Sequence, residues 1–342
     1  MRITGIKIIS VLFAFLLVGV NLTAQIKLQN GEDYILQTFK TYNIIGISEN
    51  HAQINSNDFY LKLLSNKDFQ NTVKVIIVEF CSTGYQDILD KYIAGDNVGY
   101  DEVKTAWRET GQNIDGLWER PIYFNLLKKV REVNSTLPKE KRIRVLAGDP
   151  AIDWKSVNTR EDYNSYSNKR DFPPAELAFE YGINRGQKVL IIYGGGHLRK
   201  LSDERKDSTF WTIPTLINKR KPGSIIIIDF VDTRRINFNE DFTHWPLYSL
   251  IDLNNNEIGN WDAMKYSWFY GTNRANDKEW LKPFEGHKIK DYMDALLFLG
   301  ERKDMKYSEI PKNIFQDDTF WNELNRRNKI MFGEPLDESL RK

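Results

Sequence analysis

Four short apolar runs, each with an acid or a histidine at or near its end, constrain the fold of this chain more than any other feature. The runs are NIIGISENH, which leads into Glu49 and His51, VKVIIVEF, which carries Glu79, RIRVLAGD, which ends on Asp149, and KVLIIYGGGH, which ends on His197. Such runs, rich in β-branched residues, are typical of buried strands in a parallel sheet. Because open parallel sheets bind ligands outside the carboxyl ends of their strands, these polar residues are predicted to converge on one edge.

Strand-like and helix-like segments alternate along the chain, which indicates an α/β fold. The predicted strands are Ile44–Ser48, Val73–Glu79, Arg142–Gly148, Lys188–Tyr193, Ser224–Val231 and Ala295–Gly300. The predicted helices are Asn57–Leu64 with Ser56 or Asn57 as N-cap, Gln86–Ile93 closed by Gly95, a region over Val103–Val133 broken near Gly111 and Gly116, one that starts near Pro173, and Thr212–Lys219. We expect three layers, a mostly parallel central sheet flanked by helices, with a polar loop over Asp153–Asp171 and a loop-rich C-terminal cover over Phe238–Gly286.

Length and charge narrow the class of protein. The chain has 342 residues, 48 basic and 47 acidic side chains and 41% apolar residues, which favours a globular protein. With no internal repeat and no flexible linker, we expect one domain over residues 25–342, with its core at about 42–300. A net charge of +1 gives no electrostatic reason to expect a nucleic-acid partner.

The first 24 residues have the layout of a secretory signal peptide. Arg2 and Lys7 precede the apolar stretch Ile8–Val20, and Ala24 offers a cleavage point before Gln25. A membrane anchor is the alternative, although the stretch is shorter than the roughly 20 residues that a spanning helix needs. We therefore expect export to the periplasm or the extracellular space, with no membrane span after cleavage. The lone Cys81 allows no intrachain disulfide and is expected to be a small buried apolar residue.

Two of the four histidines stand at predicted strand ends and are the main candidates for chemistry. An imidazole titrates near pH ~6.5, so it can accept a proton from water near neutrality. Glu49, two residues before His51, can fix the tautomer of that imidazole and raise its basicity. Four strand ends with the same pattern favour a functional site, because structural residues have no need to cluster at one edge.

The loop around His197 adds a candidate anion-binding group. Gly194, Gly195 and Gly196 allow a sharp turn and a close approach to a ligand, and Arg199 follows as a possible substrate clamp or oxyanion donor. The glutamates, aspartate and histidines also form a mixed oxygen and nitrogen donor set, so a divalent metal remains an alternative. The sequence requires no particular cofactor.

Taken in order, the motifs resemble those of the erythromycin esterase family, within the wider group that includes the haem-associated ChaN proteins and the Tiki peptidases. The matching segments are Gly46–His51, Val78–Phe80, Tyr92–Gly95, Leu126–Asn134, Gly148–Asp149, Arg170–Asp171 and Tyr292–Leu299. Two features depart from the pattern. Glu49 and His51 are one residue closer together than usual, or are aligned with a shift, and the paired histidines of the family are reduced to His197, with Gly194 where the other histidine could stand. The segment Gly194-x-x-His197 is closer to the Gly-x-x-His of the Tiki and ChaN relatives.

The resemblance implies an exported hydrolase of the erythromycin esterase type that acts on an ester, lactone or amide in a small-molecule or peptide substrate. The hypothesis from the residues makes His51 the general base for an attacking water, with Glu49 and Glu79 orienting it. In this hypothesis His197 and Arg199 stabilise the developing oxyanion, Asp149 holds one imidazole, and Arg170 is added as a second substrate-binding residue. The alternatives are a ChaN-like protein that binds haem or another ligand without catalysis, and a metal-dependent Tiki-like peptidase.

Overall fold

The computed structural model describes residues 26–201, 207–208, 211–231, 245–263 and 285–341. The predicted signal peptide, His244 and most of the predicted cover over 238–286 lie outside these ranges. No helix within them has both the length and the apolar character needed to cross a membrane.

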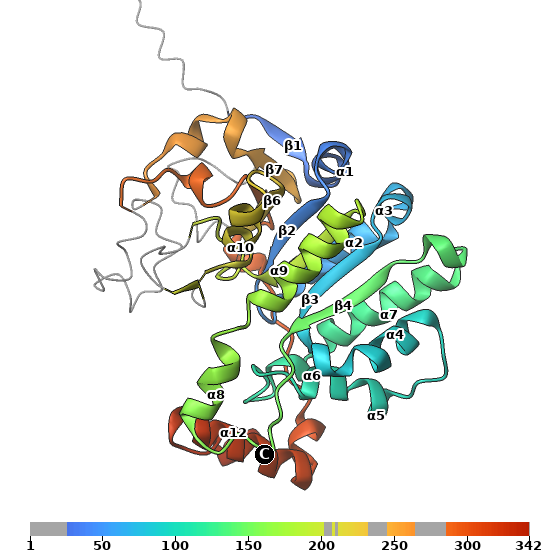
Figure 1. The fold of residues 1–342 in the computed structure, drawn as a ribbon, viewed down its shortest axis with the longest axis vertical. Coiled ribbons are helices and arrows are strands. Elements are labelled where there is room, and N and C mark those ends of the chain that lie inside the picture. The colour runs from blue at the N-terminus through green and yellow to red at the C-terminus, as the bar shows by residue number, and fades with distance from the viewer. Residues whose placement is uncertain (1–25, 202–206, 209–210, 232–244, 264–284, 342) are drawn as a thin grey trace, which may run out of the picture.

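A single mixed sheet forms the centre of the fold (Figure 1). Its strands are β1 (Leu28–Asn30), β2 (Ile44–Glu49), β3 (Val75–Ser82), β4 (Arg144–Asp149), β5 (Val189–Gly194), β6 (Ile225–Val231), β7 (Ser249–Asp252) and β8 (Ala295–Phe298). They are arranged in the order β1-β7-β8-β6-β2-β5-β3-β4. All neighbours from β8 to β4 are parallel, whereas β1 and β7 add antiparallel pairs at the other edge. All six predicted strands are present.

Helices cover both faces of the sheet, which confirms the predicted three-layer α/β class. One face packs against α1 (Gly31–Thr41), α2 (Ile54–Ser65), α3 (Lys67–Thr72), α4 (Gln86–Ala94), the short α5 (Tyr100–Val103) and α6 (Thr105–Arg108), and α7 (Pro121–Ser135). The other face packs against α9 (Phe172–Ala178), a π-helical turn (Phe179–Asn184) and α10 (Ile213–Arg220). Because both faces are covered, the central strands are apolar along their whole length.

Two helices lie together at one end of the molecule in Figure 1, away from the other helical layers. They are α8 (Arg160–Ser167) and α12 (Asp318–Phe332). The prediction of a polar loop over Asp153–Asp171 is therefore wrong in part, because the middle of this range forms α8. A capping box in which Thr159 and Asp162 exchange hydrogen bonds starts α8 and is the sequence signal for it.

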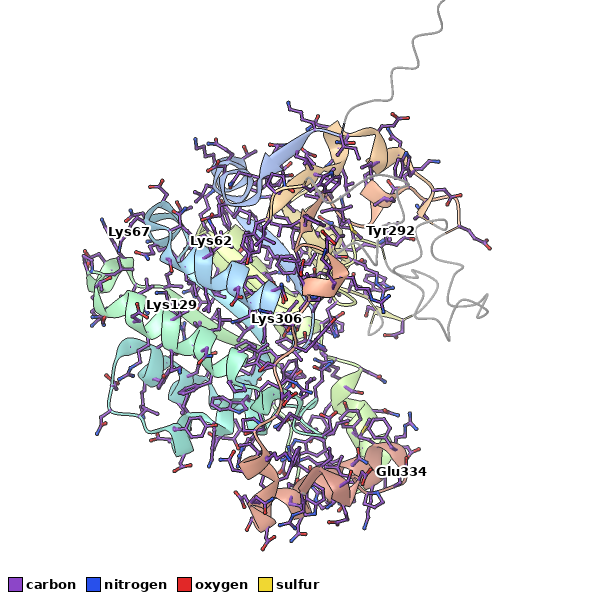
Figure 2. All side chains as sticks on the ribbon, turned by 180° about the vertical axis from the view of Figure 1, so that it is seen from behind. Lys62, Lys67, Lys129, Tyr292, Lys306 and Glu334 are labelled. Carbon is purple, nitrogen blue, oxygen red and sulfur yellow. The ribbon has the colours of Figure 1, made fainter. Side chains whose placement is uncertain are left out.

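The start of α2 shows a second correction. The helix begins at Ile54, so the predicted caps Ser56 and Asn57 lie inside its first turn. Its N-cap Gln53 makes no side-chain cap hydrogen bond. Instead the N–H of Ile54 donates to the carbonyl of Lys306 over 2.9 Å, and Figure 2 shows Lys306 beside this helix. The hydrogen-bond acceptor for this amide therefore comes from a distant segment, whereas in most helices a nearby N-cap side chain provides it.

The predicted end of α4 is confirmed, because Gly95 closes it with φ of 103°. The predicted end of β3 is wrong. This strand continues to Ser82, so Glu79 lies inside it, at a point where the register with β4 shifts between Val78 and Ser82. Such irregularities re-aim side chains near sites.

Candidate active site

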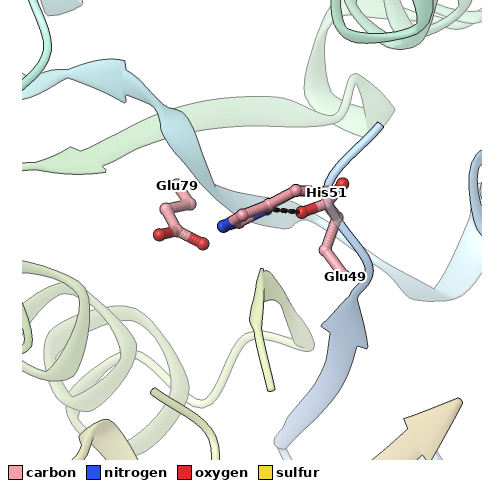
Figure 3. A group of neighbouring side chains, drawn as sticks. All are labelled: Glu49, His51 and Glu79. Carbon is pink, nitrogen blue, oxygen red and sulfur yellow. Dashed lines mark hydrogen bonds and ion pairs between the residues drawn. The ribbon is translucent and has the colours of Figure 1, made fainter. Parts of the chain in front are cut away.

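The carboxyl ends of four neighbouring strands bring the predicted site residues to one edge of the sheet. In the order β2, β5, β3, β4 the strands carry Glu49, Gly194, Glu79 and Asp149, and His51 and His197 follow β2 and β5. Figure 3 shows Glu49, His51 and Glu79 side by side, with the His51 ring between the two carboxylates.

His51 is held by a carboxylate through one ring nitrogen. Its Nδ1 hydrogen bonds with Oε2 of Glu49; because a carboxylate only accepts, Nδ1 carries the proton and Nε2 is the nitrogen left for chemistry. The hydroxyl of Tyr123 donates to Oε1 of Glu49 over 3.2 Å and accepts from the N–H of Ala52 over 3.0 Å. Trp118 packs edge-on against the imidazole, with 5.0 Å between ring centroids.

The backbone after His51 turns sharply, because Ala52 has φ of 66°, in the left-handed region that non-glycine residues rarely adopt. Burial lowers the pKa of His51, but the hydrogen bond and charge of Glu49 outweigh it and raise this pKa to about 9. The imidazole is therefore protonated in the resting site at neutral pH, although its side chain is 36% exposed.

Glu79 is the buried centre of the site, with 2% exposure. Its Oε1 accepts from Nη2 of Arg170 over 2.7 Å, and its Oε2 accepts from the N–H of Gly194 over 2.6 Å. Nε2 of His197 lies 3.5 Å from Oε1. Burial raises the pKa of Glu79, but the charges of His197, Arg170 and His51 lower it to about 2, so this carboxylate stays ionised.

Gly194 lies in a tightly packed position between two site residues. A Cβ at this position would lie 3.2 Å from Oε2 of Glu79 and 3.3 Å from Cε1 of His51. A side chain at this strand end would therefore require both neighbouring side chains to shift. Gly148 is required for a similar reason, since a Cβ there would lie 2.1 Å from the hydroxyl of Tyr193.

His197 repeats the arrangement of His51 with a different carboxylate. Its Nδ1 hydrogen bonds with Oδ1 of Asp171, and its Nε2 lies 3.4 Å from Nη1 of Arg170. Burial lowers the pKa of His197, but Asp171 and Glu79 raise it above the ordinary imidazole value. Asp171 is a residue that sequence reasoning missed as a site residue; its only signal was its place beside Arg170.

The role predicted for Asp149 is wrong. Asp149 does not hold an imidazole; its Oδ1 accepts from Nε of Arg170 over 2.8 Å, and its Oδ2 accepts from the N–H of Gly111 over 2.7 Å. Arg170, 9% exposed, is thus fixed between Asp149 and Glu79. The two carboxylates raise its pKa further in spite of burial, so it is a permanent cation beside His197.

Arg199 lies at a different part of the strand edge. It lines a cavity of about 20 Å³, room for about one water molecule, whose lining residues include neither His51 nor Glu79. The cavity is bordered by Ser48 and Asp229, a hydrogen-bonded pair that sequence reasoning did not single out. Within the described residues, Arg170 has the position next to His197 that the sequence hypothesis gave to Arg199.

The other chemistry-bearing residues have structural roles. Cys81 is fully buried, and burial raises the pKa of its thiol, so the prediction of a buried apolar residue is confirmed. His287 is 43% exposed and pairs with Asp291 at 3.5 Å.

A divalent metal is the one cofactor that the donor set suggests. One donor atom each of Glu49, His51 and Glu79 lie within 4.8 Å of one another. Both oxygens of Glu79, however, already accept from Arg170 and Gly194. A metal ion would have to compete with the fixed charge of Arg170, so the residues fit a site without a metal better.

Comparison with known proteins shows the fold. No protein-family model matches the sequence, and no curated protein does. A solved Bacillus cereus protein has a TM-score of 0.50 at 11% identity, and a succinoglycan biosynthesis protein has 0.52 at 10%; each match covers 81% of this chain and 92% of the other. A structure of cofacial haem binding to ChaN of Campylobacter jejuni has a TM-score of 0.35 at 16% identity, covers 59% of this chain and 86% of that one, and carries no functional argument.

Proposed function

We propose that this chain is an exported hydrolase of the erythromycin esterase type, which activates water against an ester, lactone or amide in a small-molecule or peptide substrate. One observation supports it most: two imidazoles, each held through Nδ1 by its own carboxylate, both lie close to the ionised Glu79. Nε2 of His51 is thereby left for proton transfer. Nε2 of His197 instead lies beside Arg170 and Glu79, which ties this ring to the cation.

The two imidazoles take different roles because their neighbours differ. His51 is the more exposed ring and has Glu49 to stabilise its protonated form, so in its neutral form it acts as the general base for a water molecule. His197 lies beside the permanent cation Arg170, so this pair stabilises negative charge on the carbonyl oxygen of the substrate.

The proposed reaction balances in two proton transfers. His51 takes one proton from water as the hydroxide oxygen bonds to the carbonyl carbon of the substrate. His197 and Arg170 stabilise the resulting oxyanion. When the bond to the leaving group breaks, the imidazolium of His51 returns the proton to that group, and the site is restored.

A panel of ester, lactone and peptide substrates tests the proposal. We expect hydrolysis by the wild-type protein and its loss in His51→Ala and His197→Ala, with both variants still folded as judged by circular dichroism. Wild-type turnover in either variant would rule out the assignment of roles. Mass spectrometry of the secreted protein tests export, because cleavage after Ala24 leaves a chain that starts at Gln25.

The same panel separates the alternatives. The cluster of Glu49, His51 and Glu79 favours metal-dependent peptide hydrolysis as the second candidate. Loss of activity in chelator and its return with Mn²⁺, Co²⁺ or Zn²⁺ would support that candidate, whereas we expect activity to survive the chelator. A Soret band on titration with haem, lost in His51→Ala and accompanied by no turnover, would support ligand binding without catalysis.

A further inference from the structure

The C-terminal helix α12 contacts the segment that borders the candidate site, although it lies beyond the predicted core of residues 42–300. We call residues 108–119 the wall segment. Two of its residues reach the site: the N–H of Gly111 donates to Oδ2 of Asp149 over 2.7 Å, and Trp118 packs against His51. The position of the wall segment therefore affects the surroundings of both Arg170, through Asp149, and His51.

One side chain of α12 holds this segment at two backbone positions. Arg327, 1% exposed, donates through Nη1 to the carbonyls of Arg108 over 2.6 Å and Asn113 over 3.3 Å. Its Nη2 donates to Glu109 over 3.1 Å, and its Nε donates to Glu323 of the same helix over 2.7 Å. Removing the guanidinium deprives both carbonyls of this donor and both carboxylates of this cation.

Further contacts connect the positions held by Arg327 to the rest of the wall segment. Arg108 forms an ion pair with Glu119 at the other end of the segment, over 3.0 Å, and its guanidinium lies 3.8 Å from the ring centroid of Phe320 of α12. The side chain of Asn113, whose carbonyl Arg327 holds, accepts from the N–H of Trp118 over 3.4 Å. A contiguous set of contacts therefore joins Arg327 to the indole that touches the His51 ring.

We propose that Arg327 is a positioning residue of the candidate site, which holds the wall segment so that Trp118 stays against His51 and Gly111 stays on Asp149. Its effect on turnover rests on the proposed function, whereas its effect on the His51 ring does not. The two parts can therefore be tested separately.

The test compares Arg327→Met, Arg327→Lys and the control Arg326→Met. Arg326 pairs with the same Glu323, but it donates to the carbonyls of Trp154 and Val157. It reaches the wall segment only indirectly, through the indole of Trp154, which donates to the carbonyl of Thr110 over 3.2 Å. The readouts are NMR signals of the histidine rings, of which the chain has four, and kcat and KM on the best substrate.

In Arg327→Met we expect the His51 ring protons to shift, because the ring current of Trp118 is lost, while the signals of His287 stay unchanged. We expect kcat to fall by about 10- to 100-fold, with a smaller change in KM, as the site loses its geometry. Arg327→Lys keeps the charge but cannot reproduce the planar fork, so its shift should be smaller and in the same direction. Arg326→Met, which makes no direct contact with the wall segment, should shift the His51 signals and lower kcat much less than Arg327→Met.

A folded Arg327→Met protein with wild-type His51 signals would overturn the proposal. If that variant does not fold, Arg327→Lys decides: wild-type signals and kcat overturn the proposal, and shifted signals support it. Shifted His51 signals in a protein that hydrolyses nothing would leave Arg327 as a positioning residue and remove the proposed function instead.

Discussion

The backbone N–H of Gly194 donates to Oε2 of Glu79 over 2.6 Å, and this hydrogen bond fixes the position of the carboxylate in the candidate site. The donor belongs to the end of β5, and the acceptor belongs to β3, the strand beside it. Because the glycine has no side chain, both the carboxylate of Glu79 and the ring of His51 can lie close to its backbone.

Gly194→Ala should disturb the site without preventing folding. The added methyl lies 3.2 Å from Glu79 and 3.3 Å from His51, closer than ordinary carbon contacts, so both side chains must move. We expect turnover to fall by about 100-fold and the free energy of unfolding to fall by about 1–3 kcal/mol. Steady-state kinetics and denaturant unfolding measure both. Gly195→Ala is the matched control, because its nearest contacts are at an ordinary 3.5 Å.

Glu49→Gln should move the pH profile of kcat/KM. In the wild type the base form of His51 accumulates as pH rises through about 9, so activity should increase up to that pH. The amide removes the charge that raises this pKa, so the midpoint in the variant should move toward the ordinary imidazole value. Profiles from pH 6 to 10, about the range of both midpoints, measure the shift. An unchanged midpoint would mean that another group controls the profile.

Glu79→Gln should remove an acid-sensitive part of the stability. A carboxyl whose folded pKa is lowered to about 2 stabilises the protein above its unfolded pKa of about 4.5 and loses that contribution as pH falls toward 2. The shift corresponds to about 3 kcal/mol. The difference in unfolding free energy between wild type and variant should therefore shrink as pH falls from about 4.5 to about 2. Urea unfolding at several pH values measures it, and a constant difference would contradict the role of this charge.

Asp171→Asn should weaken the oxyanion side of the site. Without this charge the pKa of His197 should fall, so less of the ring is protonated at neutral pH. The stability that the pair contributes is complete below about pH 6.5 and is lost as pH rises through the folded pKa. We expect kcat to fall by about 100-fold, measured beside ring NMR of His197. Asp229→Asn is the control, since Asp229 bonds Ser48 on another strand.

The position of the site could be predicted because strand ends are a local pattern. A continuous apolar run that stops at an acid or a histidine marks both a buried strand and its end, as for β2 with Glu49 and β4 with Asp149. The antiparallel strands β1 and β7 escaped prediction because they have only three and four residues, too few for a period to be visible.

The partners of each side chain were not predictable, because they depend on strand order and not on sequence order. β5 is inserted between β2 and β3, so Gly194 lies between His51 and Glu79, although these two residues come from earlier in the chain. The prediction paired Asp149 with an imidazole. In the structure the two residues before α9 take these partners, because Arg170 binds Asp149 and Asp171 binds His197.

The sequence alone therefore determined the α/β class, the edge of the sheet where the candidate site lies and its two histidines, since apolar runs and their polar ends are local properties. Only the tertiary structure decided which carboxylate holds which ring, which side chains a Cβ at residue 194 would meet, and that α12 contacts the segment that borders the candidate site. Hydrogen bonds and close contacts form between residues far apart in the sequence, such as Arg327 and Arg108, which are 219 residues apart, and no local pattern records them.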